Sequence, residues 1–205
     1  MEFRDSHRRL QDRFDTRRLA DRLASVAGDD VTAFRDFIEA RDMFFLATAD
    51  ADGKPECSYK GGAPGFVRVV DASTLAFPSY DGNGMYLSTG NVTENPSVGM
   101  LFIDFANGSR LRVNGEATID PDDPLAADYP GAQFVVRVQV RAAFPNCRRY
   151  VHTHDLANPS VFVPGPDGPP PVPDWKRDPW FDGTLAAHDP AHDPANPSAP
   201  AMPQF

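Results

Sequence analysis

Residues 43–115 constrain the fold most, because short apolar or alternating segments follow one another there with turn residues between them. The first turn covers residues 50–54, where Gly53 can adopt a positive φ. Several short strands at this close spacing favour an antiparallel barrel over a parallel sheet. The predicted strands are residues 43–49, 55–60, 66–70, 74–78, 98–103, 109–119 and 134–141.

One insert, a loop followed by a helix, interrupts this series of strands between Phe77 and Pro96. We expect its helix to cover about residues 83–94, because the residue before a proline disfavours the helical conformation. Aligned N–H groups and the positive end of a helix dipole suit a dianionic phosphate, although a capped surface helix has a similar composition. The segment matches neither the P-loop nor the Rossmann glycine pattern. The polar candidates are Ser79, Asn83, Ser88, Thr89 and Asn91.

Cations in the neighbouring strands could supply the positive charge that the insert lacks. Lys60 precedes the pair Gly61-Gly62, which would let a ligand approach the backbone closely, and Arg68 lies within an apolar strand. The alternative, and the more common meaning of a charge in a strand, is that both are solvated on the polar face of the barrel. Further along, Arg148 and Arg149 could reach an anionic ligand across a subunit interface or remain surface charges.

Composition limits the partners and the compartment. The chain has 205 residues and a formal net charge of −9, which disfavours nucleic acid and anionic membrane as partners. No apolar stretch is long enough to span a bilayer, and no secretory signal is evident at the start of the sequence. Cys57 and Cys147 do not form a disulfide framework, so we expect two reduced thiols in a cytoplasmic protein.

Other chemistry has little support in the sequence. His152 and His154, and the His-Asp pairs at 188–189 and 192–193, lack a compact third ligand, so we expect no metal site. No spacing indicates a Ser/His/Asp or Cys/His triad, and we assign no catalytic residue.

Helices and a proline-rich tail flank the predicted barrel. Residues 1 to about 27 are expected to be helical, with Leu19, Leu23 and Val26 on one face, and a second helix is expected from about 30 to 41. Thirteen of the 21 prolines lie after residue 154, a composition that cannot build its own core. The domains are therefore predicted as an N-terminal helical extension (1–29), the barrel (30–155) and the tail (156–205). Trp175, Trp180 and Phe181 should anchor the tail on the barrel or on a partner subunit.

A series of short stretches occurs in a characteristic order along the chain: Phe44-Phe-Leu-Ala-Thr, Gly53-Lys-Pro, Ser58-Tyr-Lys-Gly-Gly-Ala-Pro-Gly-Phe-Val-Arg-Val, Thr74-Leu-Ala-Phe-Pro, Gly82-Asn-Gly, Gly90-Asn, Asn95-Pro, Leu101-Phe-Ile-Asp-Phe and Arg110-Leu-Arg-Val-Asn-Gly. Taken in this order, they resemble the pyridoxamine 5′-phosphate oxidase-like FMN-binding split-barrel family over residues 30–155. The resemblance implies a mainly β fold with flanking helices, a six-stranded antiparallel split β-barrel, and a homodimer with FMN at its interface.

The same resemblance implies a set of cofactor contacts. The family's cationic Ser-Arg-Lys run corresponds here to about Tyr86-Leu-Ser88, which carries no charge. As a whole, the resemblance implies an FMN-dependent oxidoreductase acting on an unknown small substrate. One alternative is a deazaflavin cofactor such as F420. The other is a protein that binds flavin or haem without enzymatic activity. The implied contacts are Arg68 and Val69 along the flavin, Phe77, Pro78 and Ser79 lining it, Asn83 and Ser88 near the phosphate with Thr89 and Asn91 behind, and Lys60 on the phosphate or ribityl chain.

Overall fold

The computed structural model describes residues 2–147, 151, 152, 154, 162, 171–179, 185 and 189–198. The chain forms two compact units, residues 1–156 and residues 157–205, and each is described by itself.

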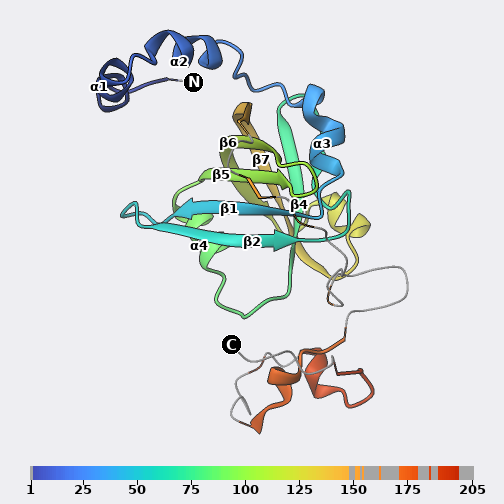
Figure 1. Ribbon diagram of the computed structural model, residues 1–205. Coiled ribbons are helices and arrows are strands. Elements are labelled where there is room, and N and C mark those ends of the chain that lie inside the picture. The colour runs from blue at the N-terminus through green and yellow to red at the C-terminus, as the bar shows by residue number, and fades with distance from the viewer. Residues whose placement is uncertain are drawn as a thin grey trace. The chain divides into compact units, whose positions relative to one another are not determined.

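The first unit is built on a single antiparallel sheet of seven strands, in the order β2-β1-β5-β6-β7-β4-β3 (Figure 1). The resemblance implied six strands, whereas the sheet has seven, with the short β3 at its edge. The strands are β1 (Met43–Ala49), β2 (Pro55–Gly61), β3 (Arg68–Val69), β4 (Thr74–Tyr80), β5 (Ser97–Asp104), β6 (Ser109–Asp120) and β7 (Ala132–Asn146).

Two strands differ most in length from the prediction. The strand expected at 66–70 shrinks to β3, because Gly65 has a φ of 88° and Phe66 N–H donates to Ala63 O in a turn. β7 is longer than the expected 134–141, because it pairs with most of β6 as far as Arg110 opposite Asn146. A bulge at Gly115 lies where the two backbones approach closely, and a Cβ there would lie 2.4 Å from Gln139 O.

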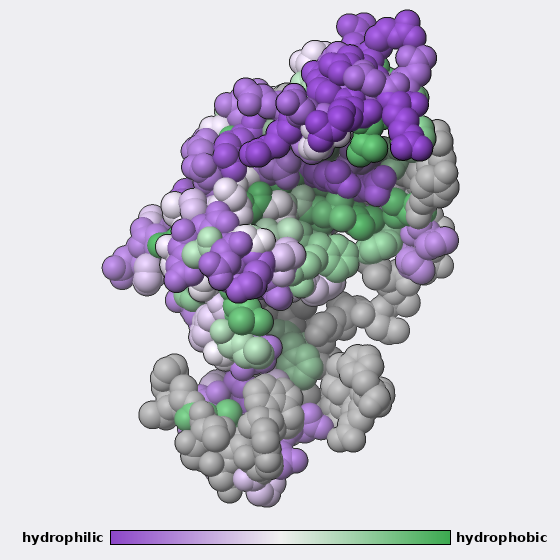
Figure 2. Space-filling view, turned by 90° about the vertical axis from the view of Figure 1, so that its left-hand side faces the viewer, coloured by the Kyte–Doolittle hydropathy of each residue, from purple (hydrophilic) through white to green (hydrophobic). Residues whose placement is uncertain are grey.

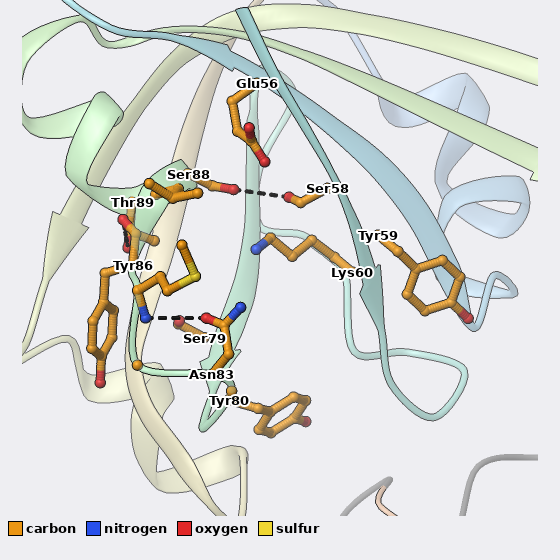
Figure 3. Close-up of a pocket in the computed structure, with 14 residues that line it drawn as sticks. Glu56, Ser58, Tyr59, Lys60, Ser79, Tyr80, Asn83, Tyr86, Ser88 and Thr89 are labelled. Carbon is orange, nitrogen blue, oxygen red and sulfur yellow. Dashed lines mark hydrogen bonds between the residues drawn. The ribbon is translucent and has the colours of Figure 1, made fainter. Parts of the chain in front are cut away.

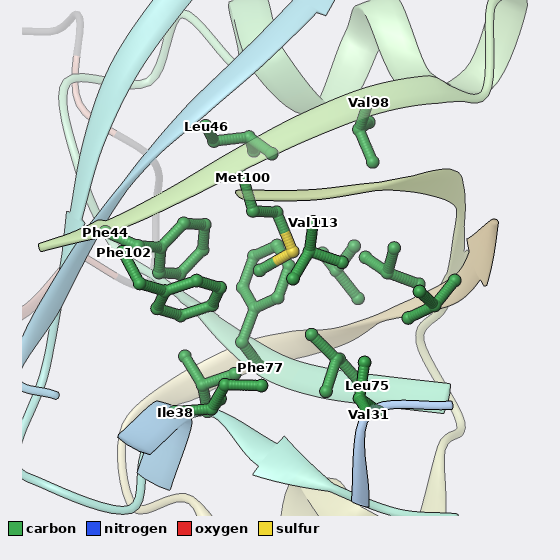
Figure 4. Packing of buried hydrophobic residues seen from close by; sticks show 14 of the residues in the cluster. Val31, Ile38, Phe44, Leu46, Leu75, Phe77, Val98, Met100, Phe102 and Val113 are labelled. Carbon is green, nitrogen blue, oxygen red and sulfur yellow. The ribbon is translucent and has the colours of Figure 1, made fainter. Parts of the chain in front are cut away.

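The sheet curls around a hydrophobic core. β1 and β4 are separated by three strands in the hydrogen-bonding order, yet the rings of Phe44 and Phe77 have centroids only 5.0 Å apart. Phe102 of β5 packs 5.2 Å from Phe44 on the same inner side (Figure 4). The sequence therefore forms a split β-barrel whose inner residues come from every second position of the strands.

Helices lie outside the strands of the first unit. The helix expected over residues 1–27 is divided into α1 (Asp5–Arg13) and α2 (Arg17–Ala24), because Asp15 takes a φ of 50° between them. The second predicted helix forms as a 3₁₀ turn, η1 (Thr32–Phe34), followed by α3 (Arg35–Glu39). Within the described residues, no helix is both long enough and apolar enough to cross a bilayer. The remaining elements of this unit are α4 (Leu87–Glu94) and the 3₁₀ helix η2 (Pro124–Asp128).

The insert helix α4 begins at Leu87 rather than at residue 83. Gly84 has a φ of 74°, and Asn83 Oδ1 accepts a hydrogen bond from Met85 N–H at 3.0 Å, so these residues form a turn before the helix. Asn91 then fixes α4 to the barrel, since its Nδ2 donates to Thr48 Oγ1 of β1 at 3.1 Å.

The second unit contains a small buried centre that its proline-rich composition did not predict. Val172 is buried, and Lys176 Nζ lies 2.8 Å from Asp189 Oδ2 in a buried ion pair. The two aspartates of the His-Asp-Pro-Ala near-repeat form the same kind of turn. The side chains of Asp189 and Asp193 each accept a hydrogen bond from the backbone N–H of the residue two positions later. The predicted anchors Trp180 and Phe181, and the side chain of Trp175, lie outside the described residues. The 3₁₀ segments among the described residues of this unit are η3 (Asp174–Arg177) and η5 (Pro190–His192).

Candidate functional site

A cavity of about 290 Å³ lies between β2, the end of β4 and the loop that leads into α4 (Figure 3). β2 and the segment from the end of β4 to the start of α4, which are separated in the sequence, therefore line one cavity. The lining residues are Glu56, Ser58, Tyr59, Lys60, Ser79, Tyr80, Gly82, Asn83, Gly84, Met85, Tyr86, Leu87, Ser88 and Thr89.

The β2 wall of the cavity follows the period of two of a β-strand. Glu56, Ser58 and Lys60 are each partly buried, whereas Cys57 and Tyr59 between them are exposed. Glu56, Ser58 and Lys60 point towards α4 in Figure 3, and the ring of Tyr59 points away. Ser58 Oγ lies 2.9 Å from Ser88 Oγ, so a hydrogen bond joins the centre of this wall to the first turn of α4.

The opposite wall is the N-terminus of α4. Gly90 N–H donates to Tyr86 O at 2.7 Å and closes the first turn of the helix. The N–H groups of residues 87–89 precede this bond and have no acceptor within the helix. Tyr86 holds the left-handed conformation, with a φ of 50°, and its hydroxyl donates to Gln133 Oε1 at 3.0 Å. The positive end of the helix dipole thus lies at the cavity.

Lys60 gives the cavity its positive charge. Burial removes water from the ammonium group and lowers the pKa of Lys60 below the ordinary 10.5, while the negative charge of Glu56 acts in the opposite direction. In Figure 3 the amino group points into the cavity. Among the residues that the structure describes, none forms a hydrogen bond or an ion pair with this ammonium. A partly desolvated ammonium that makes no direct ion pair can bind an anionic ligand.

Half of the predicted cofactor contacts meet in this cavity. Their role in binding stays a prediction. Within the glycine pair after Lys60, a Cβ on Gly62 would lie 2.5 Å from the ring of Phe66. Gly62 therefore makes room for a core aromatic residue, and the expected approach of a ligand to this pair stays a prediction. The predicted contacts that line the cavity are Lys60, Ser79, Asn83, Ser88 and Thr89.

The other predicted contacts have partners within the protein and do not line the cavity. Arg68 Nη1 lies 2.6 Å from Asp128 Oδ2, and the guanidinium stacks 4.7 Å from the ring centre of Tyr129. Asn91 holds α4 on β1. The predicted role of these side chains in cofactor binding stays a prediction. The remaining three, Val69, Phe77 and Pro78, are buried.

Several cavity residues were absent from the prediction. Glu56 and Ser58 share the face of Lys60 at intervals of two, and this alternation could have revealed them. Met85, Tyr86 and Leu87 form an exposed apolar rim, for which the sequence carried no clear signal.

Of the residues considered for a metal site, His152 and His154 are described and do not line the cavity. His154 N–H donates to Phe105 O at 2.8 Å near the turn between β5 and β6. Within the described ranges, no three His, Cys, Asp or Glu side chains are grouped so that they could hold a metal ion. Cys57 and Cys147 are both free and exposed. Arg148 and Arg149 lie outside the described residues.

The fold and the cavity define a split β-barrel with an anion-compatible site beside a helix N-terminus. The sequence matches the Pyridoxamine 5′-phosphate oxidase family over residues 31–150, which is more than half of its 205 residues. The chain belongs to this family. Comparison with curated proteins gave no match.

Solved structures with a similar fold carry several different descriptions. A putative pyridoxamine 5′-phosphate oxidase from Lactobacillus delbrueckii is 26% identical, with a TM-score of 0.45 over 57% of this chain and 94% of that one. HutZ, the heme storage protein from Vibrio cholerae, is 19% identical, with a TM-score of 0.39 over 55% and 91% of the two chains. An FMN-binding protein from Syntrophomonas wolfei is 10% identical, with a TM-score of 0.41 over 67% and 97%.

Proposed function

We propose that the cavity binds the phosphate of a flavin, with FMN as the leading candidate, and that the protein is a flavin-dependent oxidoreductase. The observation that carries this proposal is Lys60, a partly buried ammonium that faces the cavity and has no ion-pair partner among the described residues. Membership of the Pyridoxamine 5′-phosphate oxidase family makes a flavin the expected ligand.

Electrostatics supports an anion at this place. The free energy lost by removing water from Lys60 is offset when a phosphate oxygen accepts a hydrogen bond from the ammonium. The N–H groups at the start of α4 lie across the cavity and suit the same phosphate. Ser58 and Ser88 add hydroxyl groups between the two walls.

The size of the cavity supports a site shared by two subunits. Its volume of about 290 Å³ is at the lower end of the range for small-molecule pockets, about 300–1,000 Å³. We therefore infer that it holds the phosphate and ribityl chain, and that the flavin ring extends past the apolar rim of Met85, Tyr86 and Leu87 towards a partner subunit. These three side chains are exposed in the single chain, and a second copy would bury them.

The outer face of the sheet offers a surface for such a homodimer. Tyr59, Phe45 and Leu101 lie side by side across β2, β1 and β5, and the rings of Phe45 and Tyr59 pack edge to face at 6.1 Å. Phe45 and Leu101 are partly buried, and Tyr59 is exposed. A patch of hydrophobic residues is visible among hydrophilic ones on one face in the space-filling view (Figure 2). Burial of these side chains against a second copy would stabilise a dimer.

The chemistry would divide between cofactor and protein. A bound flavin supplies the oxidation and reduction. This chain's residues bind its phosphate, and the rim around the cavity excludes water from the ribityl chain. No titratable side chain of the cavity is placed in a catalytic role, and the substrate remains a small molecule of unknown identity.

Two alternatives concern the ligand and the activity. A deazaflavin such as F420 is compatible with the first turn of α4, because residues 87–89 carry no charge and do not select a dianion. Non-enzymatic storage or transport of a flavin would need only the binding part of the proposal. Haem is less suited to this cavity, since none of the described residues that line it is a histidine.

The test is the visible absorption spectrum of the purified protein, with mass analysis of the compound that heat releases. We expect a flavin spectrum, or the appearance of one after addition of FMN, and turnover with a reductant and an acceptor. A protein that neither contains nor takes up any flavin would refute the proposal. Bound flavin that is never reduced or reoxidised would refute the enzymatic part alone.

A further inference from the structure

Glu56 places a negative charge in the same cavity as Lys60. Both residues line the cavity from β2, and Ser58 lies between them. Ser58 is hydrogen-bonded to Ser88 in the first turn of α4, so Glu56 and Lys60 flank the point where this turn contacts β2. A phosphate at this point is therefore within reach of the carboxylate as well as of the ammonium.

The charges around this point come from few groups. Among the described residues, the titratable side chains that line the cavity are Glu56 and Lys60 together with three tyrosines. Tyrosines are neutral near pH 7, and burial raises the pKa of Tyr59 and Tyr80 further. The first turn of α4 contributes no titratable side chain, and Asp81 follows Tyr80 in the chain outside the lining. Near neutral pH the cavity thus has one positive and one negative side chain.

This balance does not match a doubly charged phosphate. One ammonium and the dipole of a helix face a dianion, but the Glu56 carboxylate would repel it. When two anionic oxygen groups come into direct contact, one proton shared between them removes the repulsion and forms a charge-assisted hydrogen bond. A phosphate monoester already has its second pKa near 6, so it accepts such a proton readily.

We propose that Glu56 makes this cavity selective for a phosphate with a single negative charge. The ligand class is a phosphodiester, or a monoester that shares one proton with the Glu56 carboxylate. The proton comes from the solvent, and no other bond forms or breaks. This inference rests on the proposed binding of a flavin phosphate in the same cavity.

A clear pH dependence follows for FMN. Above about pH 6 its affinity, taken relative to that of riboflavin, should fall up to about tenfold for each pH unit, because the singly charged form becomes scarce. Riboflavin 4′,5′-cyclic phosphate is a diester with one charge throughout this range. Its affinity relative to riboflavin should stay constant from about pH 6 to about pH 8.

Isothermal titration calorimetry of FMN in buffers of different ionisation enthalpy measures the proton directly. For the wild-type protein at about pH 7.5 we expect an uptake of close to one proton per FMN, and none for riboflavin or the cyclic ester. Glu56→Gln should abolish the uptake and strengthen FMN binding. Glu116→Gln is the matched control, because Glu116 is an exposed strand residue that does not line the cavity, and it should behave as the wild type.

The outcomes separate the two proposals. Flavin binding without proton uptake, or uptake that persists in Glu56→Gln, would overturn this inference and leave the flavin site standing. Persistent uptake would assign the proton to another group, such as Lys60. Failure of FMN, riboflavin and the cyclic ester to bind at all would overturn the proposed function and this inference with it. The pH series on the wild-type protein needs no variant to fold.

Discussion

Two cations of the barrel, Lys60 and Arg68, look alike in the sequence and differ in the structure. Both were predicted to contact the cofactor, Lys60 at its phosphate or ribityl chain and Arg68 along the flavin. Arg68 is paired with Asp128 and stacked on Tyr129, whereas Lys60 faces the cavity with no ion-pair partner among the described residues. The difference shows that the residue type does not reveal which cation is available. Whether the cation is available depends on its ion-pair partner, and the partner of Arg68 lies 60 residues further along the chain.

The surroundings of Arg68 form a structural corner, which we define as Arg68, Asp123, Asp128, Tyr129 and Arg137. Arg137 Nη2 donates to Asp123 Oδ1 at 3.0 Å, and Asp123 also accepts the N–H of Leu125 at the start of η2. Tyr129 is buried, and burial raises the pKa of its hydroxyl to about 12. If the comparison is right, changes in this corner alter stability, and changes in the cavity alter ligand binding.

The largest expected effect belongs to Asp123→Ala. The Asp123 side chain is 1% exposed and Arg137 is 31% exposed. Removing one partner of such a pair should lower the free energy of unfolding by about 3 kcal/mol, at the low end for buried pairs because Arg137 keeps some water. Urea unfolding measures this, with the exposed neighbour Asp122→Ala as control. Equal stability of the two variants would contradict the assignment of this corner.

Arg68→Met should have a smaller effect on stability and almost none on binding. The ion pair is largely exposed, at 36% and 55% for the two side chains, so with the cation–π contact it should contribute about 1 kcal/mol. We expect the dissociation constant of FMN to change less than about twofold, because no charge-assisted hydrogen bond to the phosphate is lost. A loss of FMN binding would show that Arg68 contacts the cofactor, and would contradict the conclusion that only Lys60 of these two cations is available to the ligand.

Ser88→Ala tests the helix wall of the cavity. Removing this hydroxyl should weaken FMN about fivefold, the effect of one lost hydrogen bond of about 1 kcal/mol, and leave riboflavin unchanged. Fluorescence titration of both flavins measures it. Thr93→Ala, whose hydroxyl donates to Gly90 O on the exposed side of the same helix, is the control. The same loss in both variants would indicate damage to the helix rather than to a site.

The smallest expected effect is the pH dependence of the flavin-free protein. Burial lowers the pKa of Lys60 in the folded state, so the unfolded chain binds more protons between that value and the ordinary 10.5. Stability from this group is therefore present above pH 10.5 and is lost as the pH falls through the folded pKa. Lys60→Met should unfold at higher urea concentration than the wild type near pH 7, and this advantage should disappear at high pH. A destabilised variant at neutral pH would show that Lys60 has a stabilising partner.

The sequence predicted the parts of the fold that depend on local chemistry. The strand at 43–49 and the turn at Gly53, with a φ of 80°, are confirmed, because alternation and a glycine turn are local signals. The start of α4 was wrong by four residues, since the Asn83 turn competes with the helix for backbone hydrogen bonds.

The site was predictable only where its residues gave a local signal in the sequence. Polar residues of the insert pointed to the α4 wall, and five of the ten candidate contacts line the cavity. Glu56 was missed, although its spacing from Lys60 was visible. The pairing of Arg68 with Asp128 could not be predicted, because η2 approaches β3 only through tertiary structure.

The most direct test of the central claim is a comparison of FMN and riboflavin affinities in the wild type and in Lys60→Met, with Lys54→Met as control. Lys54 is an exposed lysine paired with Asp52 in the turn after β1. If Lys60 holds the phosphate, the preference for FMN over riboflavin should fall about thirtyfold in Lys60→Met, or about 2 kcal/mol, while riboflavin binding stays constant. An unchanged preference would contradict the account, because the phosphate would then lie outside this cavity.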